Sequence, residues 1–389
     1  MLKIERSIQI LLVCIFVAML GLGIIGPIMP LYASDLGANL VQIGLLSSAW
    51  SISRLIFTAP AGRYSDRRSK KKVIMAGLLV YSIISFLYVV AWDITSLISI
   101  RFLHGLGSAM TMPIAMAYGA ALAPQGREGR YMGLMSSAMF AGMGIGPYLG
   151  GTLTDMFGTK SVAFYAMGGL SALSLLLVIV FLPDQKVESE RGDAPQPSFM
   201  KVLSVKILRA AFVYRVVGAL GRGSVMGFLS MYLSNPVAEG GLGVSLSMVG
   251  LILSVSQLAS AFLQGPFGEL ADRYNKIRLI LLSGVLGAMG LALIPLAHNT
   301  WEAMAAQLFF TIGGALGMPA LTAIVAIEGR ELGLGTTMSV LQSSMSVGMI
   351  AGPLLSGILG DLFGLKIIFY IGSIIYLMGT AAFFVLERM

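Results

Sequence analysis

Four arginines lie inside long apolar runs of the sequence, where a charged side chain is costly and usually has a function. They are Arg54, Arg101, Arg215 and Arg222. A guanidinium in such surroundings can bind a carboxylate or a phosphate group. Arg222 lies about 18 Å into its run at 1.5 Å per helical residue, which is near mid-depth of a membrane. It is therefore a candidate substrate contact, and a packed contact with backbone carbonyls is an equal alternative.

Arg101 and His104 are three residues apart, so they share one face of a helix. Histidine is the side chain whose ordinary pKa, near 6.5, suits proton transfer at physiological pH. Proton handling and a purely structural hydrogen-bonded pair both remain open for these two residues. Arg54 and Gln307, which occupies the position of Arg101 in the second half of the chain, complete the candidates for proton or substrate contacts.

The acidic residues give a contrasting pattern, because all 18 can be placed in loops or near helix ends. This distribution argues against a mechanism in which a carboxylate deep in the membrane exchanges protons for cations. The chain has one cysteine, Cys14, and two histidines. It therefore has no intramolecular disulfide, no cysteine-based metal site and no recognisable catalytic set. We expect a protein that is not an enzyme and that has neither a cofactor nor a metal.

The elements that position these residues are membrane helices, because 57% of the chain is hydrophobic and only 11% is charged. A membrane helix needs about 20 mostly apolar residues. The sequence predicts twelve such runs: 8–32, 41–62, 73–91, 95–119, 131–154, 161–182, 210–233, 246–267, 278–296, 301–327, 336–359 and 367–386.

The basic residues predict the orientation of these helices. Twenty of the 26 Lys and Arg residues fall in the termini and in one set of alternate loops, and two fall in the other set. The positive-inside rule therefore places both termini in the cytoplasm of a multi-pass protein of the cell membrane, inner or plasma. The net charge of +8 lies in these loops, so we expect no nucleic-acid partner.

The chain repeats itself with an offset of 206 residues. Asp66 matches Asp272, and Asp155 matches Asp361. Two parallel six-helix halves predict an all-α membrane protein with two pseudo-symmetric bundles around a central site. We expect an N-terminal bundle over 1–183, a cytoplasmic linker over 184–207 and a C-terminal bundle over 208–389.

A charged stretch, "GRYSDRRSKKK" over 62–72, follows the second apolar run, and "GELADRYNKIR" over 268–278 repeats its glycine-to-Asp-Arg step. We interpret the first stretch as a cytoplasmic loop. It resembles the loop 2–3 signature of the major facilitator superfamily, which implies a gating role beside a topological one. The gating candidates are Gly62, Asp66, Arg67, Lys71, Gly268, Asp272 and Arg273.

Glycines in the fifth run have a more specific spacing. They resemble the helix 5 motif of the drug:proton antiporter branch of the same superfamily. The motif residues are Gly133, Gly142, Gly146, Pro147, Gly150 and Gly151. Glycines four apart allow close helix packing, and proline bends the helix. "RFLHGLGSA" over 101–109 also resembles a helix 4 signature of the family, with His104 where glutamine is usual.

The resemblance implies a secondary transporter, and the antiporter motif implies a proton-coupled exporter of amphipathic molecules or drugs. The alternative is an anionic or lipid-like substrate anchored by Arg222. We expect a monomer whose partners are a small-molecule substrate, protons and membrane lipids. "GLGIIG" over 21–26 matches a dinucleotide-binding spacing, but it lies in an apolar run without the required strand, so we interpret it as a packing feature. Candidate cavity residues are Tyr32, Met112, Met116, Tyr232, Phe310 and Met318.

Overall fold

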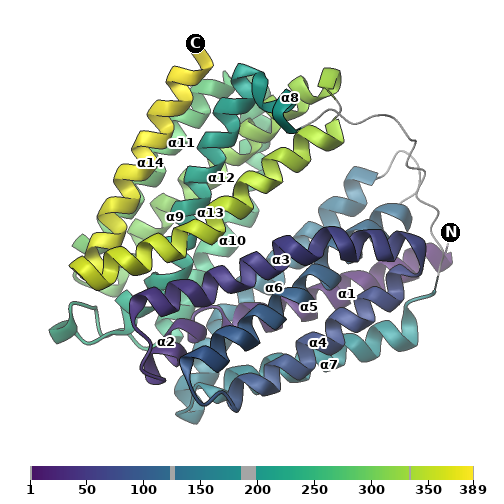
Figure 1. The fold of residues 1–389 in the computed structure, drawn as a ribbon, viewed down its shortest axis with the longest axis horizontal. Coiled ribbons are helices and arrows are strands. Elements are labelled where there is room, and N and C mark those ends of the chain that lie inside the picture. The colour runs from purple at the N-terminus through teal and green to yellow at the C-terminus, as the bar shows by residue number, and fades with distance from the viewer. Residues whose placement is uncertain (1, 123–127, 185–198, 333, 389) are drawn as a thin grey trace. The chain divides into compact units, whose positions relative to one another are not determined.

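The computed structural model describes residues 2–122, 128–184, 199–332 and 334–388, and these are helical apart from short connections (Figure 1). The helices are α1 (Leu2–Ile25), α2 (Ile28–Asp35), α3 (Leu40–Arg67), α4 (Lys70–Val89), α5 (Ile94–Leu122), α6 (Glu128–Phe157), α7 (Ser161–Phe181), α8 (Phe199–Ser204), α9 (Lys206–Ser234), α10 (Leu246–Arg273), α11 (Lys276–Leu293), α12 (Thr300–Leu332), α13 (Leu334–Phe363) and α14 (Leu365–Arg388).

Ten of these helices are long and apolar enough to cross a membrane, judged on the described residues by length and composition. The other two predicted runs, 95–119 and 131–154, lie within the long helices α5 and α6. The prediction of an all-α chain with twelve membrane-length helices is confirmed.

The first predicted run, 8–32, is wrong as a single helix. The structure ends α1 at Ile25 and starts α2 at Ile28. Pro27 has no backbone N–H to continue the helical ladder, and the N–H of Gly26 turns back to the carbonyl oxygen of Gly23 at 3.2 Å. A proline therefore divides an apolar stretch that hydropathy alone joins.

The loop predicted for the charged stretch 62–72 is also wrong in extent. Helix α3 continues to Arg67 and α4 begins at Lys70. The hydroxyl of Ser69 caps α4 by accepting from the N–H of Lys72 at 3.2 Å. Charged residues extend a membrane helix readily where it reaches water, so charge marked the end of the span and not the end of the helix. The side chains of Asp66 and Arg67 lie outside the described residues.

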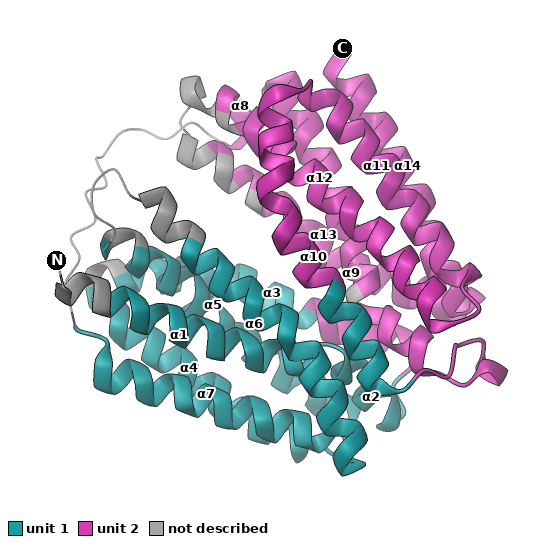
Figure 2. Ribbon diagram, turned by 180° about the vertical axis from the view of Figure 1, so that it is seen from behind, with its two compact units in different colours: residues 1–38, 49–191, 245–255 teal, residues 39–48, 192–244, 256–389 magenta. Residues whose placement is uncertain are grey.

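The chain divides into two compact units (Figure 2). Unit 1 comprises residues 1–38, 49–191 and 245–255, and unit 2 comprises 39–48, 192–244 and 256–389. Within unit 1, α1 packs against α6 and α7, and α4 packs against α5 and α7. Within unit 2, α9 packs against α13 and α14, and α11 packs against α12 and α14. The same pairing in both units is the structural counterpart of the sequence repeat.

The first turns of α10 belong to unit 1, where they pack against α6. The carboxylate of Asp155, at the end of α6, accepts a hydrogen bond from the backbone N–H of Ser247 at 2.8 Å and another from its hydroxyl. A carboxylate at the start of a helix satisfies free N–H groups and complements the helix dipole. Asp155 therefore holds the beginning of α10 in this unit.

The first turn of α3 has the matching arrangement in unit 2. Asp361, at the end of α13, accepts from the N–H groups of Leu40 at 2.9 Å and Val41 at 3.0 Å. Asp361 is the repeat partner of Asp155, so the duplication extends to these contacts. The domain boundaries predicted from the sequence follow chain order, whereas the compact units exchange these two short segments.

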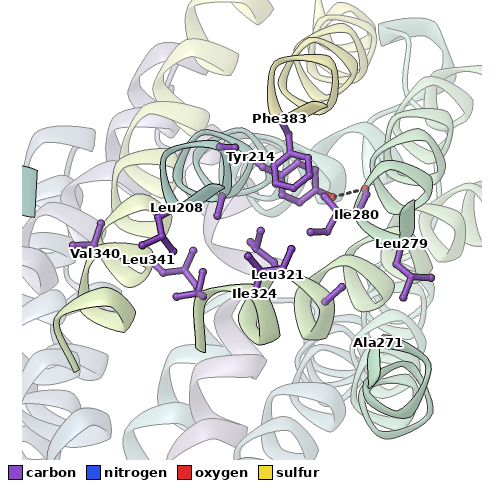
Figure 3. Packing of buried hydrophobic residues seen from close by; sticks show 14 of the residues in the cluster. Leu208, Tyr214, Ala271, Leu279, Ile280, Leu321, Ile324, Val340, Leu341 and Phe383 are labelled. Carbon is purple, nitrogen blue, oxygen red and sulfur yellow. Dashed lines mark hydrogen bonds between the residues drawn. The ribbon is translucent and has the colours of Figure 1, made fainter. Parts of the chain in front are cut away.

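The core of unit 2 is a cluster of buried side chains from the helices α8 to α14 (Figure 3). Tyr214 and Phe383 pack with ring centroids 5.6 Å apart. The hydroxyl of Tyr214 meets the hydroxyl of Ser283 at 2.6 Å and the carbonyl oxygen of Ile280 at 3.4 Å. This bonding places a polar group in an apolar core without leaving it unsatisfied.

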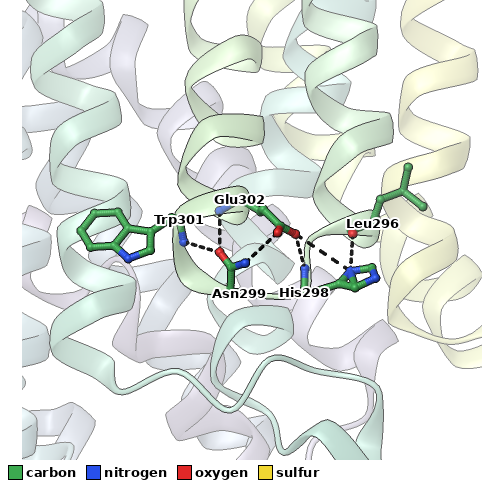
Figure 4. Close-up of polar contacts among 5 residues, drawn as sticks. All are labelled: Leu296, His298, Asn299, Trp301 and Glu302. Atoms are coloured by element: carbon green, nitrogen blue, oxygen red, sulfur yellow. Dashed lines mark hydrogen bonds and ion pairs between the residues drawn. The ribbon is translucent and has the colours of Figure 1, made fainter.

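A polar cap fixes the start of α12 (Figure 4). The side-chain oxygen of Asn299 accepts from the N–H groups of Trp301 at 3.1 Å and Glu302 at 3.0 Å. Glu302 in turn accepts from the side chain of Asn299 at 2.7 Å and from the N–H of His298 at 2.8 Å. This reciprocal cap sets the register of the helix that carries Met318 into the site.

Candidate functional site

A cavity of about 40 Å³ lies inside unit 2, among α9, α12, α13 and α14. One water molecule needs a cavity of about 10–15 Å³ on this measure, so the space suits a chemical group of about three heavy atoms. Two arginines of α9 line it. Its other lining residues are Tyr214, Gly218, Ala219, Gly314, Gly317, Met318, Leu321, Met345 and Tyr376.

Arg215 is mostly enclosed and is bonded only to sulfur among the described residues. Its guanidinium contacts the sulfur of Met318 and, at 3.3 Å, the sulfur of Met345. The Nε atom is buried without a hydrogen-bond partner. Thioether sulfur is a weak acceptor, so the positive charge of Arg215 is poorly compensated.

Arg222 lies two turns further along α9 and is exposed. One terminal nitrogen lies 3.7 Å from the position that a Cβ atom would take on Gly314. Within the described part of the chain, no carboxylate forms an ion pair with Arg222. Arg222 is one of the residues that line the cavity of unit 2, and its role in substrate binding stays a prediction.

A second cationic cluster lies within unit 1, around Trp50. The guanidinium carbons of Arg54 and Arg101 lie 5.4 and 5.8 Å from the centroid of the Trp50 ring. Both distances suit cation–π attraction. The Nε1 atom of Trp50 and the Nε atom of Arg101 are buried without hydrogen-bond partners. The aromatic ring therefore stabilises two charges that no described acid neutralises.

His104 is fully buried between these groups and two tyrosines. Its Nδ1 atom lies 2.7 Å from the hydroxyl of Tyr88 and 3.2 Å from a terminal nitrogen of Arg101. Arginine only donates, so Nδ1 is an acceptor and the ring proton is on Nε2. Tyr81 packs edge-on against the ring at 4.8 Å. Nδ1 can take a proton only after Arg101 turns away.

The remaining candidates are distributed widely and do not form one site. Tyr32, in α2, bonds to the carbonyl oxygen of Tyr88 at 3.0 Å, and Met112 is buried in α5. Met116 is half-buried in the same helix. Tyr232 and Phe310 are buried in the packing of unit 2.

Gln307, predicted to match Arg101, is 5% exposed, and its side-chain oxygen has no partner. Of the cavity candidates from the sequence, Met318 is the one that lines the unit 2 cavity.

The glycines of α6 pack directly against the backbone of α1 in unit 1. A Cβ atom on Gly142 would lie 2.5 Å from the carbonyl oxygen of Phe16, and one on Gly146 would lie 2.6 Å from the Cα atom of Gly23. On Gly150 it would lie 2.2 Å from the carbonyl oxygen of Ile24. These contacts leave no room for a side chain. Gly133 lies where α6 is not described beyond its helical backbone.

The glycine of the same motif at position 151 faces α10 instead. A Cβ atom on Gly151 would lie 2.0 Å from the carbonyl oxygen of Leu246. Pro147 continues this contact, because its carbonyl oxygen would lie 2.2 Å from a Cβ atom on Gly250. The motif therefore presents two faces, one to α1 and one to the first turns of α10.

The charged stretches have fewer contacts. Lys71 donates to the carbonyl oxygen of Ile179 at 2.9 Å, which ties α4 to the end of α7. Asp272 and Arg273 are exposed at the end of α10. A Cβ atom on Gly62 or Gly268 would meet no described atom within 4 Å, so neither glycine is needed for close packing in this structure. The gating role itself stays a prediction.

Four important residues escaped the sequence reasoning: Trp50, Tyr214, Met345 and Tyr376. Aromatic and Met residues are abundant in this chain, with 13 Tyr and 25 Met, so type alone singles out none of them. Helical spacing offers one signal, because Trp50 lies one turn before Arg54 on the same helical face. No group of three metal-binding side chains occurs among the described residues.

The family model of the Major Facilitator Superfamily matches residues 11–234 and again residues 211–388. The chain belongs to the Major Facilitator Superfamily. The two matches cover the two halves of the sequence repeat. Membership makes the chain a multi-pass membrane transporter, and members of this family are not enzymes.

Known members of the superfamily are similar over nearly the whole chain. An uncharacterized MFS-type transporter of Methanocaldococcus jannaschii is 27% identical, over 99% of this chain and 100% of the relative. The quinolone resistance protein NorA of Staphylococcus aureus is 26% identical, over 92% of this chain and 90% of its own. A bacterial homolog of the human lysosomal transporter Spinster has the same fold, with a TM-score of 0.84 at 14% identity over 99% of this chain and 97% of its own.

Proposed function

We propose that this MFS transporter exports amphipathic small molecules or drugs in exchange for protons, by alternating access to a central site. In this proposal it acts as a monomer in the cell membrane, with both termini in the cytoplasm. The likeness to a quinolone resistance protein over 92% of the chain supports export of such molecules. The distribution of basic residues supports the orientation.

The observation that carries the proposal is the glycine face of α6. Three glycines bring α6 and α1 into backbone contact, where a Cβ atom would lie 2.2–2.6 Å from α1 atoms. Such contact excludes side chains and water from between the helices. An exchanger needs a sealed path, because an ion leak would dissipate the gradient that drives it.

His104 is the proposed proton carrier, since the acids of the described spans lie near their ends. While Arg101 donates to Nδ1, the ring is neutral. When Arg101 binds a substrate group instead, Nδ1 keeps only the contact with the hydroxyl of Tyr88 at 2.7 Å, and this hydroxyl can turn to accept a hydrogen bond from a protonated ring. Arg101 thereby links substrate occupancy to proton uptake in this proposal.

The test uses purified protein in proteoliposomes with an imposed pH gradient and a fluorescent amphipathic cation, dansylcadaverine. We expect saturable uptake that follows the gradient and is lost with a protonophore. His104→Gln should abolish gradient-driven accumulation while keeping downhill exchange. His298→Gln, which alters the exposed second histidine at the start of α12, is the matched control. Wild-type transport that ignores both the gradient and the protonophore would refute the coupling.

A second candidate function is transport of an anionic or lipid-like substrate anchored by Arg222. The cavity of unit 2 favours it, because two arginines and, among the described residues, no acidic side chain line that space. Arg222→Ala should then weaken anionic substrates selectively in the same vesicle assay. Equal losses for neutral and anionic substrates would reject the anchoring role.

A further inference from the structure

The cavity of unit 2 differs from an ordinary packing defect in its electrostatics. Packing defects in a helix bundle are apolar, whereas this cavity is lined by two guanidinium groups of one helix. Arg215 and Arg222 are seven residues apart, so both point from the same face of α9. Arg215 is mostly enclosed and Arg222 is exposed, and an anion placed between the two guanidinium groups would relieve the repulsion between their like charges.

The positive charge of Arg215 is the less well compensated of the two. Its terminal nitrogens meet only the sulfur atoms of Met318 and Met345, and its Nε atom meets nothing. A carboxylate would replace weak acceptors with strong ones, and charge-assisted hydrogen bonds are about twice as strong as neutral ones. The unbranched methionine side chains can move aside at low cost.

Arg222 supplies the accessible half of the site. Arg222 is exposed and lies beside Gly314. A terminal nitrogen of Arg222 is 3.7 Å from the position that a Cβ atom would take on this glycine. A planar guanidinium with a free edge can bind a carboxylate through two parallel hydrogen bonds. A cationic headgroup finds no carboxylate among the residues that line the cavity.

The space beside the arginines is large enough for a small anionic group. About 40 Å³ accepts a carboxylate or a group of similar size. Leu321, Ala219 and the two methionines form apolar wall beside the arginines. We infer that this cavity is the headgroup subsite of the transporter, and that its preferred substrates are amphipathic monoanions: one carboxylate held by Arg215 and Arg222, on an apolar or aromatic body.

This inference rests on the second candidate function, because it names the class of anionic substrate that Arg222 would anchor. Binding tests it separately from transport. The probes are three dansyl compounds with a common fluorophore: dansylglycine is anionic, dansylglycinamide is neutral and dansylcadaverine is cationic. Their fluorescence is titrated against the full-length protein in nanodiscs of zwitterionic lipid, with protein-free nanodiscs as the blank.

We expect dansylglycine to bind at least about 10-fold more tightly than its amide. Arg222→Gln should weaken dansylglycine about 10- to 100-fold, which is the loss expected for hydrogen bonds to a charged group, and should leave the amide within about 2-fold. Arg215→Gln should act in the same direction. Arg209→Gln removes an exposed arginine from the same helix, outside the cavity, and should change no probe. Acetate and inorganic phosphate, which lack an apolar body, should displace the probe poorly.

Equal binding of dansylglycine and its amide would overturn the inference, as would parallel losses of all three probes in Arg222→Gln. Efficient displacement by acetate or phosphate would overturn the requirement for an apolar body. If Arg215→Gln does not fold, the exposed position of Arg222 keeps the test decisive. Vesicles that bind dansylglycine selectively but transport no probe would refute the proposed function and leave the anion subsite intact.

Discussion

Gly150 in α6 allows a direct test of the backbone contact with α1. An alanine Cβ atom there would lie 2.2 Å from the carbonyl oxygen of Ile24 and 2.9 Å from its carbonyl carbon. Ordinary carbon–oxygen contacts are about 3.3 Å or longer, so the two helices must separate by about 1 Å. Both clashing groups are backbone, which cannot rotate away. Gly150→Ala is therefore expected to be destabilising despite the better helix propensity of alanine.

The magnitude follows from two opposing effects. Overpacking costs about 1–3 kcal/mol, and the upper end applies to a stiff backbone contact. Alanine returns about 0.5–1 kcal/mol of backbone entropy. The net loss of about 2 kcal/mol corresponds to a fall of about 4–8 °C in the unfolding temperature of a domain of this size. Thermal unfolding in detergent or nanodiscs, at one fixed scan rate, measures it.

Gly169 provides the matched control within the same unit. It lies in α7, and a Cβ atom there would meet no atom within 4 Å. Gly169→Ala should leave the unfolding temperature unchanged or raise it slightly, because helix propensity is the only term left. If Gly150→Ala and Gly169→Ala unfold at the same temperature, close packing of α6 on α1 does not stabilise the bundle and the reasoning is refuted.

Three further predictions concern carboxylates. Asp361→Asn should speed hydrogen exchange at the Leu40 and Val41 amides by about 5-fold, since loss of a helix cap costs about 1 kcal/mol. Asp155→Asn should likewise speed hydrogen exchange at the Ser247 amide. The control Asp35→Asn breaks the exposed ion pair with Lys160 and should change exchange at none of these amides. Unchanged exchange in both Asp361→Asn and Asp155→Asn would contradict the capping role of these carboxylates. Asp66→Asn should impair transport in vesicles with substrate binding largely kept, and a normal transport rate would count against a gating role. The N–H and hydroxyl of Ser96 hold the pKa of Asp93 below its usual value. Its stabilisation of the start of α5 should be complete above the unfolded pKa of about 3.9 and decline as pH falls through the lower folded value. A protection factor for the Ser96 amide that stays constant between pH 5 and 2, after correction for the intrinsic exchange rate, would exclude it.

The sequence predicted the helices well because membrane insertion depends on local composition. Each apolar run must satisfy its own backbone hydrogen bonds in lipid, so hydropathy and helical structure coincide. The predicted helix ends were wrong where the backbone starts or stops a helix at a residue that the apolar composition does not mark. Pro27 interrupts a run that is apolar throughout, and the charged residues after Gly62 continue a helix beyond the span.

The candidate site was predicted only in part. Rarity drew attention to Arg54, Arg101, His104 and Arg222, because an ionisable group in an apolar run is conspicuous. Their neighbours were not conspicuous. Tyr376 is one tyrosine of 13, and only the packing of α14 against α9 brings it to the cavity.

Composition and the repeat alone were enough to predict the membrane class, the two homologous halves and the presence of ionisable residues within the spans. These properties follow from composition and periodicity, which act along the chain. Tertiary structure decided which charges share a cavity, that the Nδ1 atom of His104 accepts from Arg101, and that Asp155 and Asp361 cap helices far away in the chain. Such contacts depend on which helix faces pack against one another in three dimensions. Composition and periodicity along the chain do not show which faces these are.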